Sequence, residues 1–328
     1  MDFSVIIPSR NRPLLLERAV LSVLQQKHAS KEIIIVNDGS DMAHQAQYEQ
    51  LAARFSSQII LVNLERTPRG HGPSYAINRG TEIAQGEFLC FLDDDDYWID
   101  ADHLDRAQAS ISSAGSGIDM YLSNQEAYRG ERRVIELLWL QPLAERLSRT
   151  HAADTHGVYR VSTKDLMGCD SFPHLNNTIV RRSLYMHVGG MDENIRYECE
   201  WDLYFRLANE AREIQYFPGI ISRHNVPDPN ANANASTSVT SLQKLLSRLI
   251  VMDKALLLTQ APTIHAVAKR IRGYTLKRIS GMLTDSGNFQ LAFYYSREAL
   301  ATSPTIKWLG YCGYLGLRAA FNLMRRAS

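Results

Sequence analysis

The stretch Glu87-Phe-Leu-Cys-Phe-Leu-Asp-Asp-Asp-Asp-Tyr-Trp98 sets four consecutive aspartates directly after an apolar run. The run has the length and composition of a buried strand, so the four carboxylates stand at its exit. Adjacent carboxylates repel one another, and holding them together costs energy unless a divalent ion or a cationic substrate neutralises them. A solvated acidic turn is the simpler interpretation, but the residues that precede the stretch favour a ligand site.

Those preceding residues alternate between apolar strands and helices. The predicted strands are 3–8, 32–36, 58–62 and 87–92, and the predicted helices are 13–27, 43–54 and 73–85. Such alternation predicts an α/β fold, a mainly parallel Rossmann-like sheet covered by helices, which binds ligands outside the carboxyl ends of its strands. Three polar clusters fall at those ends: Pro8-Ser-Arg-Asn11, Asn37-Asp-Gly-Ser40 and Asp93 to Asp96.

The clusters and their spacing resemble the nucleotide-binding half of a family-2 glycosyltransferase of the GT-A fold. The resemblance covers residues 1–225. The stretches that carry it are Val5 to Arg12, Ile35 to Ser40, Asn78, Ala84 to Glu87, Phe91 to Trp98, Asn176-Asn177, Val188 to Glu193 and Glu198 to Leu207. It implies an inverting enzyme of bacterial cell-surface glycan synthesis, which moves a sugar from a nucleotide donor to a hydroxyl group.

The resemblance also implies a set of donor-binding residues. Asp38 would accept a hydrogen bond from the N3–H of a pyrimidine, a group that cytosine lacks, so UDP-sugar is the first expectation and dTDP-sugar the second. Pro8 and Ser9 would line the base and ribose through backbone contacts, with Asn11 in the same cluster. Arg10 stands where the family often has tyrosine, and a guanidinium plane can stack on a base much as an aromatic ring does.

The aspartate run is the expected metal site. A leaving nucleotide diphosphate develops negative charge, which Mg²⁺ or Mn²⁺ stabilises as a Lewis acid, and both ions prefer oxygen ligands. Asp93 and Asp95 have the D-x-D spacing. The resemblance puts the metal on Asp95 and places Asp94 nearer the ribose. Asp96 is expected to turn inward and cap the turn at 98–102.

Two further residues are candidates for the diphosphate or the metal. Arg69 lies in a glycine-rich loop before a predicted helix, where it could approach the diphosphate. The same loop half-matches a dinucleotide fingerprint, but it lacks the third glycine, so we reject an NAD site. His224 follows a predicted strand at 215–221, and in related enzymes such a histidine can approach the metal. A lone histidine is more often structural.

An inverting transfer needs a general base to take the proton of the attacking hydroxyl. The family pattern has Glu-Asp before Trp-Asp-Leu, with the aspartate of the pair as the base. The pair here reads Cys199-Glu200, so Glu200 occupies the base position with one extra methylene. Displacing a catalytic group by about 1 Å can cost on the order of a hundredfold in rate. Asp202 is the reserve candidate, although it also suits a helix N-terminal carboxylate stabilised by the dipole.

Composition is that of a soluble intracellular enzyme. The chain of 328 residues is 45% apolar and 22% charged, enough for two modest cores. Its four cysteines form no CxxC pair, so they read as buried thiols of a reducing compartment and not as a disulfide frame or zinc site. The chain opens directly into a strand without a signal peptide, which predicts a cytoplasmic protein.

Charged residues are unevenly distributed along the chain. Residues 239–328 hold thirteen Lys and Arg against three Asp and Glu, a balance of +10, which leaves −9 for residues 1–238. The turn-rich stretch between the halves reads as a linker or active-site loop. The predicted parts are a catalytic domain at 1–225 (nucleotide-binding half 1–100, acceptor half 101–225), the linker at 226–238 and a basic helical region at 239–328.

The C-terminal region has the composition of a segment that lies on anionic lipid. Residues 308–324 are apolar apart from Arg318 and Asn322, but they are too short and too broken by glycine for a confident span. The aromatic residues Trp308, Tyr311 and Tyr314 beside Arg325-Arg326 suit an interfacial position. We therefore expect a peripheral protein on the cytoplasmic face of the membrane that acts on a lipid-linked glycan, with no nucleic-acid partner.

Two other classes of protein stay open. A nucleotidyltransferase would share the α/β start and an acidic metal site, but it should carry a glycine-rich loop with a lysine after the first strand, and Pro8 to Pro13 has neither. A non-catalytic sugar-nucleotide-binding protein of a glycan assembly complex is the other. Cys199-Glu200 is the feature that favours it, and turnover of any donor would exclude it.

Overall fold

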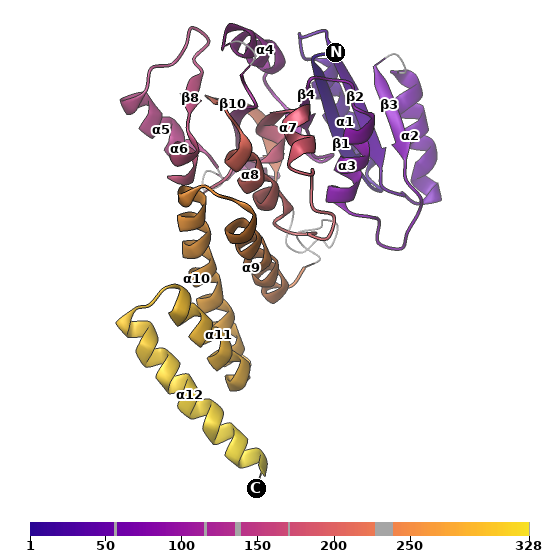
Figure 1. The fold of residues 1–328 in the computed structure, drawn as a ribbon. Helices are drawn as coiled ribbons and strands as arrows, with labels where there is room; N and C mark the ends of the chain where they lie inside the picture. The colour runs from indigo at the N-terminus through magenta and orange to yellow at the C-terminus, as the bar shows by residue number, and fades with distance from the viewer. Residues whose placement is uncertain (56–57, 115–116, 135–138, 170, 227–238, 328) are drawn as a thin grey trace. The chain divides into compact units, whose positions relative to one another are not determined.

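A computed structural model describes residues 1–328 except 56–57, 115–116, 135–138, 170, 227–238 and 328. The chain divides into two compact units, Met1–Asn230 and Ala231–Ser328 (Figure 1). The linker predicted at 226–238 lies, from residue 227 onward, outside the described residues. The predicted domain boundaries therefore stay a prediction.

The first unit is built on one mixed sheet with helices packed against it (Figure 1). Its strand order is β3-β2-β1-β4-β9-β6-β10-β5, with β7 paired to β6 and β8 to β10. The strands are β1 Phe3–Ser9, β2 Lys31–Asn37, β3 Ile59–Asn63, β4 Phe88–Phe91, β5 Tyr97–Trp98, β6 Met120–Arg129, β7 Arg132–Arg133, β8 Tyr159–Val161, β9 Thr178–Arg181 and β10 Ile214–Asn225. The helices are α1 Pro13–Leu24, α2 Met42–Arg54, α3 Pro73–Ile83, α4 His103–Ala114, α5 Gln141–Thr150, α6 Thr163–Met167, η2 Leu175–Asn177, α7 Arg182–His187 and α8 Cys199–Glu210.

The parallel part of the sheet consists of β1, β2, β3 and β4, as the alternating sequence pattern predicts. The antiparallel β9 lies between β4 and β6, and β10 runs parallel to β6. Parallel order brings the ends of β1, β2 and β4 to one edge of the sheet, so the three polar clusters of the sequence share that edge.

Close packing of helix on sheet explains why these residues form this layer. Phe3, Val5 and Ile7 of β1 are fully buried in the larger core. On α3, a Cβ at Gly80 would lie 2.7 Å from Cγ2 of Ile6, so only glycine lets this helix approach β1 so closely. Helices α1 and α3 both begin with proline in the first turn, where its missing N–H costs nothing.

The described residues of the second unit form four helices, α9 Ser241–Leu258, α10 Pro262–Asp285, α11 Phe289–Thr302 and α12 Ile306–Ala327. Helix α9 begins with a capping box in which the side chains of Thr240 and Gln243 satisfy each other's backbone N–H groups. A small core contains Leu245, Ile279 and Leu315. Within the part of the chain that the structure describes, no helix is both long and apolar enough to cross a membrane.

Candidate active site

Asp94 is held inward at the end of β4 by two donors from the β1 end. Ser9 Oγ donates to Asp94 Oδ2 at 2.7 Å, and Arg12 Nη1 donates to Asp94 Oδ1 at 3.0 Å. The Asp94 side chain is only 8% exposed. Burial raises the pKa of Asp94 to about 7, although the Arg12 guanidinium opposes the rise. Ser9 and Asp94, both predicted to contact the donor, are therefore neighbours.

Asp96 also turns inward, but its partners differ from those predicted. Its fully buried carboxylate accepts hydrogen bonds from Asn176 Nδ2 at 2.5 Å, His224 Nδ1 at 2.7 Å and Asn225 N at 2.7 Å. The prediction that it caps the turn at 98–102 is therefore wrong, because β10 and η2 supply the donors. Burial opposes protonation of His224, but the charge and hydrogen bond of Asp96 outweigh it and raise the pKa of His224.

Asp93 and Asp95 occupy the more open side of the run. The Asp93 side chain is 40% exposed, and Asp95 Oδ2 accepts from Arg12 Nη1 at 3.0 Å. Carboxylate oxygens of Asp93, Asp95 and Asp96 lie within 4.8 Å of one another. Desolvation and the charges of Asp96, Glu200 and Asp95 raise the pKa of Asp93 well above its usual value. This crowding of hard oxygen ligands fits a divalent cation such as Mg²⁺ or Mn²⁺.

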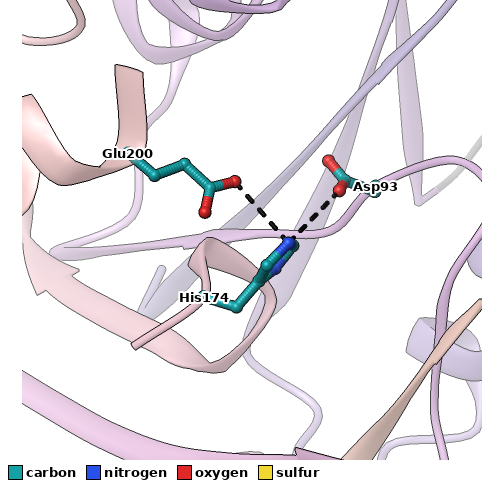
Figure 2. Close-up of side chains that lie close together, drawn as sticks. All are labelled: Asp93, His174 and Glu200. Carbon is teal, nitrogen blue, oxygen red and sulfur yellow. Dashed lines mark ion pairs between the residues drawn. The ribbon is translucent and has the colours of Figure 1, made fainter. Parts of the chain in front are cut away.

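A second group joins the acidic run to the first turn of α8. His174, just before η2, stands between Glu200 and Asp93 in Figure 2. Its Nε2 lies 3.7 Å from Glu200 Oε1 and 3.8 Å from Asp93 Oδ2. The Asn176 N–H donates to His174 Nδ1 at 3.3 Å, so the proton of the neutral ring sits on Nε2 and faces the two carboxylates. Burial, together with His224, lowers the pKa of His174 to about 3 and keeps the ring neutral.

Glu200 is a carboxyl group whose pKa is raised into the neutral range. Burial raises its pKa to about 7, helped by the charges of Asp96 and Glu198 and opposed by His224. A carboxyl group that titrates near neutrality combines an available ionised form with useful basicity. Burial likewise raises the pKa of Cys199 to about 12, which leaves this neighbour an uncharged thiol.

The reserve candidate Asp202 is not brought into this group. Two residues along α8 correspond to a rotation of about 200°, so Asp202 and Glu200 leave the helix on different sides. Arg206 donates to Asp202 Oδ2 from Nε at 3.1 Å and from Nη2 at 2.6 Å, and the aspartate is almost fully buried. A catalytic role for Asp202 stays a prediction, and this ion pair argues for a structural one.

Two backbone N–H groups of the glycine-rich loop donate hydrogen bonds to the Asp38 carboxylate. Its Oδ1 accepts from the backbone N–H of His71 at 2.8 Å, and its Oδ2 accepts from that of Gly72 at 2.9 Å. Gly70 has φ +65°, and a Cβ there would lie 2.5 Å from Asp38 Oδ2. The loop thus fixes the orientation of the carboxylate, and each of its oxygens keeps a further lone pair for a ligand.

The other predicted donor residues border this loop. Arg10 Nη2 donates to the Thr67 carbonyl at 3.0 Å, which ties the predicted stacking residue to the loop. Asn11, with φ 59°, receives a hydrogen bond from Asp41 N at 2.8 Å and so links the ends of β1 and β2. Pro8 lies at the end of β1 and is partly buried, whereas Arg69 is exposed on the loop.

The metal role of His224 stays a prediction. Among the described residues, the two groups with ligand atoms within 4.8 Å are Asp93, Asp95 and Asp96, and Asp93, His174 and Glu200. Neither includes His224, whose Nδ1 is engaged by Asp96.

Three residues that hold the site together were not among the predicted site residues. Arg12 bridges Asp94 and Asp95, and His174 faces Glu200. Asn176 accepts from Asp93 N at 2.9 Å in addition to donating to Asp96. Arg12 and Asn176 lie inside stretches that carry the family resemblance, which was their available signal, whereas a single histidine at 174 offers none.

Residues 4–169 match the family model described as Glycosyl transferase family 2. The amylovoran biosynthesis glycosyltransferase AmsB of Erwinia amylovora is 26% identical over 208 residues, 63% of this chain and 64% of that protein. The putative teichuronic acid biosynthesis glycosyltransferase TuaG of Bacillus subtilis is 41% identical over 98 residues, 29% of this chain and 36% of that protein. The match spans less than two thirds of each of these relatives.

Solved structures share the fold over almost the whole chain. S. aureus TarS 1-349 in complex with UDP-GlcNAc has a TM-score of 0.67 at 17% identity, over 93% of this chain and 82% of that one. The mannosyltransferase PcManGT from Pyrobaculum calidifontis, in complex with GDP-Man and Mn²⁺, has a TM-score of 0.58 at 16% identity, over 98% and 86%. At these identities the likeness speaks for the fold alone, and it confirms the predicted GT-A α/β fold with a helical C-terminal region.

Proposed function

The chain belongs to glycosyl transferase family 2, and from this premise we propose that it is an inverting, metal-dependent glycosyltransferase. Its donor would be a UDP-sugar, with a dTDP-sugar as the second choice. Its acceptor would be a hydroxyl of a growing, lipid-linked bacterial surface glycan such as an O-antigen, a lipopolysaccharide core or an exopolysaccharide. The names of the amylovoran and teichuronic acid relatives support a role in polysaccharide biosynthesis.

One observation carries the proposal: a carboxyl group with a pKa near neutrality, Glu200, stands across His174 from the open side of an acidic cluster. The cluster suits the diphosphate end of a donor, and Glu200 suits the hydroxyl of an acceptor. An inverting displacement needs these two functions on opposite sides of the reacting sugar carbon, because the acceptor attacks the face away from the leaving group.

On the donor side, Asp38 would recognise the base. The N–H groups of His71 and Gly72 fix its carboxylate, so a lone pair can be presented to the N3–H of uracil or thymine. Arg10, tied to the same loop, would stack on the base. The UDP-GlcNAc bound by TarS supports a uridine donor for this chain, by analogy of fold alone.

Asp93 and Asp95 would hold the metal, and Asp94 would lie nearer the ribose. A bound Mg²⁺ or Mn²⁺ would supply Lewis-acid stabilisation of the departing diphosphate. Arg12 pairs with both Asp94 and Asp95, and it would lie near the phosphate end of a donor bound at this cluster. The Mn²⁺ in PcManGT supports the choice of ion.

On the acceptor side, Glu200 would take the hydroxyl proton as the oxygen attacks the anomeric carbon. The bond from that carbon to the phosphate oxygen breaks, and both bonding electrons leave with the diphosphate. The Nε2–H of His174 points between Glu200 and Asp93, so it opposes their mutual repulsion without becoming charged itself.

The place of action would be the cytoplasmic face of the cytoplasmic membrane. Sugar nucleotides are soluble in the cytosol, whereas a lipid-linked acceptor is confined to the bilayer. The uneven charge, +10 in residues 239–328 and −9 in residues 1–238, would turn the basic helical region toward an anionic surface.

Donor turnover tests the proposal. Purified protein with Mn²⁺ and a panel of UDP-, dTDP-, GDP- and CMP-sugars should release nucleotide from one UDP-sugar, faster with membrane lipid extract than without it. Binding of a donor without any release of nucleotide would instead favour the non-catalytic sugar-nucleotide-binding protein, the class that the Cys199-Glu200 departure keeps open.

A further inference from the structure

Helix α12 exposes a continuous apolar face along its length. We define its outer face by Ile306, Leu309, Leu317, Phe321 and Met324. Their side chains are between 54% and 92% exposed. With the exposed Gly313, these positions recur every three or four residues, which places them in one stripe of the helix. A stripe of this length is more than the scattered apolar residues of an ordinary surface.

The opposite face of α12 packs against its own unit, which leaves the outer face exposed. Cys312, Leu315 and Ala319 are buried, and Leu315 belongs to the core of the second unit. Trp308 Nε1 donates to the carbonyl of Ser296 in α11. The helix is therefore anchored to its own unit along one side, and the exposed residues of the outer face lie on the other side.

The packing of α12 determines which of its side chains are exposed. The sequence assigned Trp308, Tyr311 and Tyr314 to the interface. Trp308 reaches back to α11, and the Tyr311 hydroxyl bonds with that of Thr284 at 2.9 Å. Only Tyr314 of the three is exposed, at 47%. The aliphatic residues and Phe321 form the outer face instead, and Arg325-Arg326 have side chains outside the described residues.

The exposed charged residues of α12 are basic. Helix α12 contains no aspartate or glutamate, whereas Lys307 and Arg318 are exposed on it. On α10, Lys277 Nζ lies 5.5 Å from the ring centroid of the inward-facing Trp308, and the next residue, Arg278, is exposed on the surface of the same unit. Long basic side chains can lay their stems on apolar groups while their heads stay in water.

We propose that the outer face of α12 lies in the interface of an anionic lipid bilayer, parallel to its surface. An apolar stripe with basic flanks and no acidic residue is the composition of an interfacial helix. A second copy of the chain would bring the same basic flanks against themselves, so charge complementarity selects anionic lipid as the occupant. The inference rests on the proposed function only in supplying the reason for docking, which is access to a lipid-linked acceptor.

Vesicle flotation with the full chain tests the proposal. Wild-type protein should float with vesicles of phosphatidylcholine and phosphatidylglycerol, bind pure phosphatidylcholine weakly, and lose binding as salt rises. The triple variant L309Q/L317Q/F321Q should lower the partition coefficient by about tenfold or more, because it removes apolar area from the outer face. The matched control I250Q/L257Q/L258Q changes three exposed apolar residues of α9 and should alter it less than about twofold.

A charge variant keeps the test independent of the apolar substitutions. K307E/R278E reverses two exposed charges and should weaken binding to the anionic vesicles by at least about tenfold while leaving thermal unfolding unchanged. Equal flotation of wild type and both variants would overturn the proposal. So would an equal loss in the α9 control, or a wild-type dimer in sedimentation that the α12 variant dissociates.

Nucleotide release with detergent-solubilised membrane lipid extract, in the absence of vesicles, separates this inference from the proposed function. If the wild type floats as predicted but turns over no donor, the proposed activity fails and the lipid-binding face stands. If it turns over a donor but does not bind anionic vesicles, the lipid-binding face fails and the activity stands.

Discussion

The two units of this chain differ in how exposed the charged side chains of their proposed functional surfaces are. In the first unit the carboxylates of Asp94 and Asp96 are buried, and side-chain hydrogen-bond donors hold each of them in position. In the second unit basic side chains such as Lys307 and Arg278 stand exposed on the surface. The buried carboxylates of the first unit are held in fixed positions, whereas the exposed basic side chains of the second are the ones that we propose attract anionic lipid.

The difference between buried and exposed charges can be measured as a free energy. A hydrogen bond to a buried charged group is worth about 1.5–3 kcal/mol, whereas an exposed ion pair contributes about 0–1 kcal/mol and is screened by salt. Substitutions in the first unit should therefore change chemistry or stability by large amounts. Substitutions of exposed charges in the second should change neither, and should act on lipid binding instead.

The largest expected effect is on sugar transfer. Glu200→Gln keeps the shape of the side chain but cannot take a proton, so it should lower the transfer rate by about 10²–10⁴-fold while donor binding and vesicle binding persist. Glu210→Gln, at the other end of α8 and exposed, is the control and should stay active. A Glu200→Gln rate above a tenth of the wild type would move the base to Asp202 or elsewhere.

A second prediction compares two members of the aspartate run. Asp96→Asn should lower the free energy of unfolding by about 2–3 kcal/mol, because an amide cannot accept from all the donors of Asn176, His224 and Asn225. Asp93→Asn should lose no stability in metal-free protein, because it relieves like-charge repulsion at a partly open position. Urea unfolding of both variants checks this. Equal losses would contradict the division into a buried and an open side.

The pH dependence of turnover should follow Glu200. A base works in its ionised form, and the pKa of Glu200 is raised to about 7. At saturating Mn²⁺, kcat/KM should therefore rise about tenfold per unit as pH increases toward 7 and level off above it. The measurement is a rate profile between pH 5.5 and 8.5. A rate that is flat over this range would mean that Glu200 is not the proton acceptor.

The smallest expected effect lies in the second unit. Lys307→Glu reverses a charge as completely as any substitution can, yet it should change the free energy of unfolding by less than about 0.5 kcal/mol, because the side chain is exposed. Binding to anionic vesicles should fall in the same variant. A loss of more than about 1 kcal/mol in urea unfolding would show that this charge supports the fold, against the comparison of the two units.

The sequence predicted the parallel half of the sheet because its signals are local. Apolar runs, prolines at helix starts and glycines in turns act over a few residues, and the strands at 3–8, 32–36 and 58–62 correspond to β1, β2 and β3. The polar clusters could be placed for the same reason, since the carboxyl ends of parallel strands meet at one edge.

The parts that sequence reasoning missed depend on distant contacts. The donors to Asp96 come from positions 80 to 129 residues away, and nothing in the local pattern of the run indicates them. The sequence also did not show which face of α12 is exposed, for a related reason. Both sides of this helix are apolar, so its composition could not tell that Trp308 faces α11 while Leu317 faces outward.

The most direct test of the central claim is calorimetric titration of UDP into the wild type and Asp95→Ala, each with and without Mn²⁺. The claim is that the open carboxylates of the run bind the metal that holds the nucleotide diphosphate. The wild type should bind UDP at least about tenfold more tightly with Mn²⁺ than without it, and more tightly than CDP. Asp95→Ala should stay folded and lose the Mn²⁺ dependence. Equal Mn²⁺-dependent affinity for UDP in the variant would contradict the claim.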